Sequence, residues 1–386
     1  MTSGVILMRT LILLGLPEDL ISVHLMQKGS RIHDELERKA MAAHDPSFIL
    51  VLDQGSQRSP PVIDSTDCRV LIIDHHWAPE DDNYPLGAEY VTACLSPPVA
   101  TSSLLTYHLC STLHDKVPEA CAWLCAVGTH GDLSNTFLWE PPFPDMQPTF
   151  RAYTKTAITK AVSQLNGPRR TAGYNVRTAW DALVAASSPK DIVANQALQD
   201  ARNEVNSEVA RCKRAAPKFS ADGRVAVLRI NSSAQVHPVI ATRWAGHLQS
   251  SRLEVVLVAN EGYLPGTVNF SCRVARCAKD PNREMPVNII EILQGYADKA
   301  PSPTLRARLG NSFARGHQQA SGGVVPKEEF EELMDVLEIG RKKHESRDGS
   351  EQVEQVKTKT KSSEESTQSN TLTSYFKTET VRDTRP

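Results

Sequence analysis

The chain has 386 residues, a length that predicts two domains, and 40% of them are hydrophobic, which is enough to build a core. The formal net charge is −2, so a uniformly basic nucleic-acid-binding protein is not expected, although a local basic groove is compatible with this value. The longest apolar stretch, Val5 to Leu14, contains Arg9 and is far shorter than the roughly 20 residues that span a bilayer, so we predict no membrane anchor. The eight widely spaced cysteines form no CxxC pair and indicate a reducing, intracellular compartment.

The first half of the chain alternates helical and strand patterns. A helix is predicted to begin at Thr2 and to end at Gly15, and residues 32–43 also have helical spacing. Residues 47–53 and 68–74 are apolar strands that each end in an aspartate. Apolar runs without alternation, separated by helices, predict a parallel sheet covered on both faces. Ligands of such sheets bind beyond the carboxyl ends of the strands.

The second half returns from helices to strands. Residues 150–218 are predicted to be mostly helical, strands reappear from Gly223, and residues 314–325 are rich in glycine. After Gly340 the chain is dominated by Lys, Glu, Ser, Thr and Gln, and such a segment cannot bury enough surface to offset its ordering entropy. The predicted α/β organisation is a parallel-sheet domain over 1–150, a helical connector over 151–222, a smaller mixed α/β domain over 223–338 and a disordered tail over 339–386.

Acids and imidazoles follow the predicted strands. Asp53 ends one strand, and Asp74, His75 and His76 end the next. A third segment with two glycines, which would let the backbone approach a ligand, ends at Asp132 and is expected at another strand end. Each residue alone could be a cap or a hydrogen-bonded polar group, but together they favour a metal site because buried acids need partners. Carboxylates and imidazoles without thiolates suit Mn²⁺ or Mg²⁺ better than structural zinc.

These motifs resemble the DHH phosphoesterase superfamily, with its DHH domain over 1–150 and its DHH-associated domain over 223–338. The order and separation of the motifs match over most of residues 1–335, and the most similar subgroup is the RecJ-like single-strand exonucleases and their oligonucleotidase relatives. The resemblance rests on Leu52-Asp53-Gln-Gly, Asp74-His75-His76, Gly128-Thr-x-Gly-Asp132, Phe270-Ser271-Cys-Arg273 and Gly316-His317-Gln-Gln-Ala320-Ser-Gly322-Gly323.

The resemblance implies a hydrolase of phosphodiester bonds that uses two Mn²⁺ or Mg²⁺ ions. By motif position, Asp53 would bridge the metals, and His75 and Asp132 would bind the second one. His76 would face the phosphate, and Asp74 would orient the histidines, so these two residues are assigned to catalysis.

The DHH-associated domain would bind the substrate. Arg273, beside Ser271, would grip a phosphate bidentately. The loop from Gly316 to Gly322 would present backbone N–H groups, together with His317, to the terminal nucleotide. The alternative interpretation of this loop is a glycine-rich turn without a ligand.

One motif of the family is missing from the chain. The first motif is an apolar strand followed by His and two Asp residues in a pattern like D-x-D-G-x-T-S-G, and residues 1–6 resemble only the segment directly after that motif. One metal would therefore lose a carboxylate, and the other would keep only Asp53. Either the sequence is a truncated version of an active protein or it is a degenerate member. We favour truncation because the other motifs are complete, and we expect little or no hydrolase activity from these 386 residues.

Three functions remain open. The first is a RecJ-like phosphodiesterase acting on single-stranded DNA or RNA, or on short oligonucleotides, in the nucleus. The second is a non-catalytic replication or repair adaptor that binds nucleic acid and a sliding clamp. The third is a phosphoesterase for small nucleotides or polyphosphate. The absence of a strong positive charge favours short substrates, because long strands usually need an extended basic track.

The polar tail contains one short apolar motif. Leu372, Tyr375 and Phe376 could form one helical turn that fills an apolar pocket on a partner. The segment resembles the PCNA-interacting peptide that docks on the sliding clamp; a chance aromatic pair in a solvated tail is the alternative. Residues 341–343, Arg-Lys-Lys, could belong to a nuclear import signal.

Overall fold

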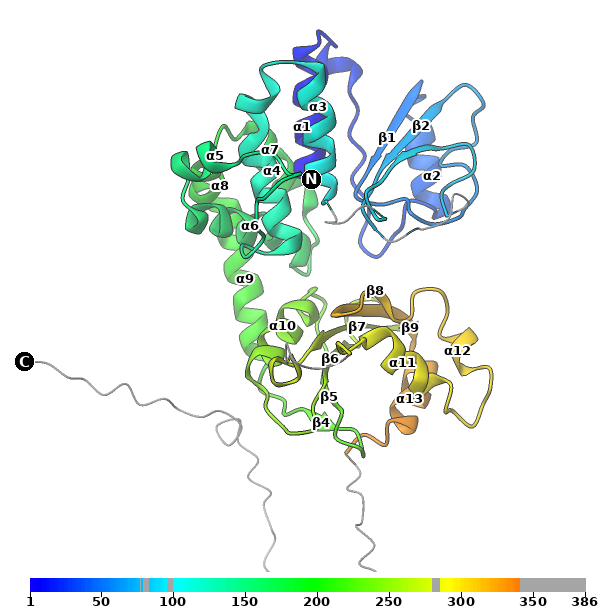
Figure 1. The fold of residues 1–386 in the computed structure, drawn as a ribbon. Coiled ribbons are helices and arrows are strands. Elements are labelled where there is room, and N and C mark those ends of the chain that lie inside the picture. The colour runs from blue at the N-terminus through cyan, green and yellow to red at the C-terminus, as the bar shows by residue number, and fades with distance from the viewer. Residues whose placement is uncertain (77, 79–82, 96–99, 280–284, 341–386) are drawn as a thin grey trace, which may run out of the picture. The chain divides into compact units, whose positions relative to one another are not determined.

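The computed structural model describes residues 1–76, 78, 83–95, 100–279 and 285–340 (Figure 1). The chain divides into two units between Ser207 and Glu208. The predicted disordered tail, with its basic run and its clamp-binding peptide, lies outside the described residues apart from its first two residues. None of the described helices combines the length and the hydrophobicity that a bilayer-spanning segment needs.

The first unit contains the predicted parallel sheet. Strands β1 (Phe48–Leu52), β2 (Arg69–Ile73) and β3 (Glu89–Val91) pair in parallel in the order β1-β2-β3. Helix α2 (Glu35–Ala42) covers one face of this sheet, and Met41 packs there with the buried Val51 and Ile72 (Figure 1). The parallel sheet confirms the fold class predicted from the apolar runs.

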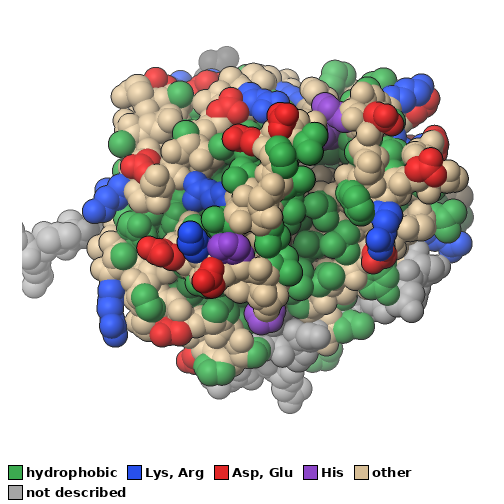
Figure 2. Space-filling view, turned by 90° about the horizontal axis from the view of Figure 1, so that it is seen from above, with side chains coloured by type: hydrophobic (Ala, Val, Ile, Leu, Met, Phe, Trp, Pro, Cys, Tyr) green, Lys and Arg blue, Asp and Glu red, His purple; other side chains and the backbone are tan. Residues whose placement is uncertain are grey.

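Strand β1 departs from the expectation that both faces of the sheet are covered. It is an edge strand, and its side chains Phe48 and Leu50 are 66% and 37% exposed. Further exposed apolar side chains of this unit lie in and after the first helix: Ile12, Leu14, Leu16 and Leu20. Figure 2 shows hydrophobic side chains gathered around a hollow on the face seen from above. Among the described residues, no element buries Phe48 on the outer face of β1.

Helices form the rest of the first unit. Their core contains the fully buried Leu124, Ile158 and Leu183, and Arg9 donates to Ala186 O at 2.5 Å. Residues 151–207, expected as part of a connector, pack largely against this core. The elements are α1 (Thr2–Leu13), η1 (Glu18–Leu20), α3 (Ser102–Leu113), α4 (Val117–Leu133), α5 (Gln147–Ala152), α6 (Lys155–Arg170), α7 (Val176–Ala185), α8 (Pro189–Ala194) and α9 (Gln196–Cys212), which crosses the boundary between the units.

The second unit is built on a mixed sheet with the strand order β4-β5-β6-β7-β9-β8. In this sheet β5 and β6 pair in parallel, and α10 (His237–His247) connects them; the other pairs among its described strands are antiparallel. The strands are β4 (Lys218–Phe219), β5 (Val225–Ile230), β6 (Val255–Asn260), β7 (Thr267–Val274), β8 (Arg315–His317) and β9 (Ala320–Pro326). This mixed sheet confirms the second α/β domain.

Helices cover the second sheet on both faces. The main core lies between one face and the helices α11 (Ile289–Ala297), α12 (Leu305–Arg308) and α13 (Lys327–Val336), and it includes Phe270, Cys272 and Phe330. Helix α10 contacts β6 and β7 but contributes no residue to that core, so it lies on the other face. A short helix, η2 (Arg276–Ala278), follows β7. The alternate residues of β7, which include Ser271 and Arg273, therefore face away from the main core.

Candidate functional site

Parallel pairing brings the acids and imidazoles of the first unit to one edge of its sheet. Leu52 pairs with Ile73, and the amide of the next residue, Asp53, donates to Ile73 O at 3.0 Å. Asp74 follows Ile73 directly, so both acids leave the sheet at the carboxyl ends of neighbouring strands. Asp53 has a φ of 64°, a left-handed conformation that is uncommon for a residue with a side chain. Aspartate tolerates this conformation better than most residues do.

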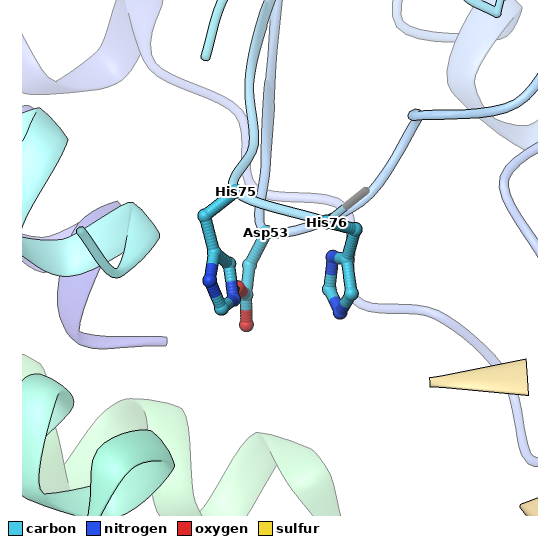
Figure 3. Close-up of side chains that lie close together, drawn as sticks. All are labelled: Asp53, His75 and His76. Atoms are coloured by element: carbon cyan, nitrogen blue, oxygen red, sulfur yellow. The ribbon is translucent and has the colours of Figure 1, made fainter. Parts of the chain in front are cut away.

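His75 lies at the centre of the cluster. Its Nε2 is 3.5 Å from Asp53 Oδ1 and 3.3 Å from Asp132 Oδ2. One ligand atom from each of Asp53, His75 and His76 lies within 4.8 Å of the others, and Figure 3 shows these three side chains side by side. Two carboxylates and two imidazoles of the first unit thus converge, and His75 is only 3% exposed. This is a donor set that a hard or borderline divalent cation could bind.

Asp74 accepts hydrogen bonds from both histidines of the cluster. Its carboxylate is buried and accepts hydrogen bonds from His75 N at 2.8 Å, from His76 Nδ1 at 2.7 Å and from Ser56 N at 3.2 Å. Burial alone would raise the pKa of Asp74, but these hydrogen bonds outweigh it and hold the pKa below its ordinary range. The bond to Asp74 raises the pKa of His76. Because Nδ1 of His76 is occupied by Asp74, its Nε2 is the ring nitrogen left to contact a ligand.

Asp132 comes from a helix, which corrects the expectation that a third strand end would carry it. Residues 127–132 form the last turns of α4. The first glycine of this motif allows helix packing instead of backbone approach to a ligand: a Cβ at Gly128 would lie 2.1 Å from Ser103 Oγ and 2.3 Å from Thr2 Oγ1. Within the motif, His130 Nε2 accepts a hydrogen bond from Trp139 Nε1 at 3.2 Å.

The substrate-binding residues predicted in the second unit share one sheet. Ser271 pairs with Gly322, and Arg273 with Ala320, across β7 and β9. The segment expected as a loop is a β-hairpin, in which β8 and β9 pair along their lengths. Its glycines allow close strand packing: a Cβ at Gly322 would lie 2.5 Å from Phe270 O, and Gly316 has a φ of 108°. The glycines thus serve the hairpin geometry, which replaces the predicted loop of free N–H groups.

The sequence prediction omits Arg315. The register pairs it with Gly322, on the opposite side from Ser271, and His317 pairs with Ala320. The signal that could have identified it is the two-residue alternation of a strand, which assigns Arg315 and His317 to the same face.

Comparisons with known proteins bear on the fold. Neither protein-family models nor the curated proteins match the sequence. RecJ from Thermus thermophilus in complex with Mn²⁺ superposes with a TM-score of 0.58 at 17% identity, over 87% of this chain and 49% of that one. The chain thus spans about half the length of that RecJ.

Two further solved structures match over a larger share of their own length. A manganese-bound exonuclease RecJ has a TM-score of 0.51 at 16% identity, over 87% of this chain and 86% of that one. The DHH domain of a protein assigned to a family of ribosomal proteins has a TM-score of 0.56 at 13% identity, over 88% of this chain and 84% of that one. At these identities the similarity establishes the fold.

Proposed function

Since the chain has the fold of the DHH phosphoesterase superfamily, we propose that it is a metal-dependent phosphodiesterase of the RecJ-like type, acting on the ends of single-stranded nucleic acid or on short oligonucleotides. The observation that carries this proposal is the cluster in which His75 Nε2 lies within 3.5 Å of Asp53 and 3.3 Å of Asp132. Separate strand and helix ends converge there, and they bring two carboxylates to one buried imidazole, His75.

The donor set fits Mn²⁺ or Mg²⁺. Asp53, His75 and Asp132 supply oxygen and nitrogen ligands, and none of the cysteines belongs to the cluster. A bound divalent cation supplies activation of water and neutralisation of the charge on the phosphate. His76, fixed by its bond to Asp74, would contact the phosphate of the substrate through Nε2.

We also propose that these 386 residues hold only part of a two-metal site. A second cation would find only Asp53 as a shared ligand, since the His and Asp residues of the family's first motif are absent. Among the described residues no strand pairs with the outer edge of β1, and this edge supports the proposal of a longer form in which another strand carries the missing ligands.

The expected result of an activity assay follows from this ligand count. With single-stranded oligonucleotides and Mn²⁺, the chain should cleave no faster than its Asp132→Ala variant, because in-line displacement needs both cations. Gel analysis of end-labelled DNA and RNA oligonucleotides measures this. Clear Mn²⁺-dependent cleavage that the Asp132→Ala variant abolishes would refute the proposed deficiency while supporting the cluster itself.

The same ligand count favours a second candidate function. A chain that keeps the fold and a single cation site but lacks cleavage would act as a non-catalytic adaptor, binding nucleic acid and a sliding clamp in the nucleus. The two candidates differ in one measurable property: an extension that restores the first motif should generate cleavage in a truncated phosphodiesterase and none in an adaptor.

A further inference from the structure

Tyr84 buries a hydroxyl group in an apolar core of the first unit. The residue is 5% exposed and belongs to the same core as Val62 and Ile72. Among the described residues, its Oη has no hydrogen-bond partner. A phenylalanine would fill the same space without the cost of burying a hydroxyl, so the hydroxyl indicates a polar function at this position.

Two contacts fix the position of Tyr84. Its ring stacks on that of Tyr90 from β3, with the ring centroids 3.8 Å apart and the ring planes only 4° from parallel. The next residue, Pro85, forms a β-bridge with Ser59. The segment around Tyr84 is therefore held against the loop that follows β1, and this loop contains Ser56.

The phenol of Tyr84 faces polar side chains next to the metal cluster. Burial raises the pKa of Tyr84, and the side chains of Thr92 and Ser56 lower it, so both hydroxyls lie near the phenol. The charge of Asp74 also raises this pKa. Thr92 Oγ1 already accepts a hydrogen bond from Cys94 N at 3.1 Å. Ser56 Oγ is buried and has no partner among the described residues, so it is the hydroxyl that Tyr84 can satisfy.

Asp74 can accept a further hydrogen bond from Ser56. Its Oδ1 accepts from His75 N at 2.8 Å and from His76 Nδ1 at 2.7 Å. Among the described residues, Oδ2 accepts only from Ser56 N, at 3.2 Å, and so keeps a lone pair for Ser56 Oγ. Burial alone would raise the pKa of Asp74, whereas His76 and the Ser56 side chain lower it, which places the Ser56 hydroxyl beside this carboxylate.

We propose that Tyr84 is a positioning residue of the metal cluster: its hydroxyl donates to Ser56 Oγ, and Ser56 donates to Asp74 Oδ2. The carboxylate held in this way fixes the two histidines that it already bonds. Residues that hold metal ligands through hydrogen bonds change the metal affinity without touching the ion. This inference rests on the proposed function in one respect, namely that the cluster binds a divalent cation. Neither Tyr84 nor Ser56 belongs to the motifs that carry the family resemblance.

Calorimetric titration of the full chain with MnCl₂ tests this role without an activity assay. Tyr84→Phe removes only the hydroxyl, so the Mn²⁺ affinity should fall by about 10-fold, the lower end of the range for a lost partner of a metal ligand. Ser56→Ala should cause a similar loss. Because Tyr84 acts through Ser56, the double variant should bind Mn²⁺ no more weakly than Ser56→Ala alone.

Tyr90→Phe is the matched control. It removes the same atom from the ring that stacks on Tyr84, but Tyr90 is 37% exposed on the edge strand β3, so this variant should keep the wild-type Mn²⁺ affinity. Urea denaturation separates positioning from stability. A hydroxyl with a merely structural role would change the free energy of unfolding in Tyr84→Phe and leave the Mn²⁺ affinity unchanged.

Wild-type Mn²⁺ affinity in Tyr84→Phe, or losses that add in the double variant, would overturn the proposal. His75→Ala, measured in the same series, identifies the cause. If His75→Ala weakens Mn²⁺ binding and Tyr84→Phe does not, the positioning role is wrong and the cluster stands. If neither variant weakens binding, the cluster itself is wrong, and the positioning role with it.

Discussion

Replacing His75 with alanine is expected to weaken Mn²⁺ binding by at least about 100-fold. Removing a residue that only hydrogen-bonds to a metal ligand typically weakens binding by about 10- to 100-fold, and His75 is expected to bind the metal directly. The reason is that His75 Nε2 is the shared neighbour of both carboxylates, 3.5 Å from Asp53 and 3.3 Å from Asp132. Asp132→Asn, which leaves no cavity, should also weaken Mn²⁺ binding. Titration calorimetry with MnCl₂ measures both affinities, and the unaltered chain should bind about one ion because only one of the two expected cation positions keeps more than one protein ligand.

His108→Ala provides the matched control for this titration. His108 is exposed on α3, and its loss should leave Mn²⁺ affinity unchanged. Because His75 is buried, its replacement could disturb folding, and circular dichroism would establish that each variant is folded. Equal affinity in the wild type, His75→Ala and Asp132→Asn would show that the cation binds elsewhere.

Gly128→Ala should destabilise the first unit by about 3 kcal/mol, the upper end of the range for overpacking. The added Cβ would lie 2.1 Å from Ser103 Oγ and 2.5 Å from Ser103 Cβ, so α4 must move away from α3. The added Cβ would also lie 2.3 Å from Thr2 Oγ1, so it would press on both oxygens of the hydrogen bond between Thr2 Oγ1 and Ser103 Oγ, which is 2.6 Å long. Urea denaturation followed by circular dichroism measures the loss.

Gly131→Ala is the internal control for that effect. It lies in the same helix, where an added Cβ would meet only Val162 Cγ1, at an ordinary 3.6 Å. Alanine should stabilise the helix at this position by about 0.5–1 kcal/mol, since glycine loses more backbone entropy on folding. A loss of stability in Gly131→Ala, or none in Gly128→Ala, would contradict the packing described for α4.

The strands that carry the cluster were predictable because their apolar runs are long and bounded by acids. Residues 47–53 and 68–74 were expected, and β1 and β2 span Phe48–Leu52 and Arg69–Ile73. Parallel pairing then requires Asp53 and Asp74 to leave the sheet at the same edge. The convergence of these acids therefore follows from local pattern and sheet geometry together.

The helical structure around Asp132 could not be predicted, because a local motif does not reveal which side chains pack against it. The glycines before Asp132 suggested a ligand-binding turn, whereas Gly128 faces Ser103 and Thr2 on two other helices. Contacts between residues so far apart in the sequence leave no periodic signal.

The hairpin of the second unit was missed for a related reason. Residues 314–325 contain several glycines, which disfavour a strand prediction, yet β8 and β9 pair there and Gly322 allows β7 to approach closely.

We expect Asp53, His75 and Asp132 to hold a divalent cation. Anomalous diffraction from crystals grown with MnCl₂ tests it most directly, because manganese scatters anomalously and its position is then observed. We expect a peak within bonding distance, about 2.0–2.3 Å, of His75 Nε2 and of both carboxylates. Manganese peaks that all lie away from these three side chains in well-ordered crystals would contradict the claim.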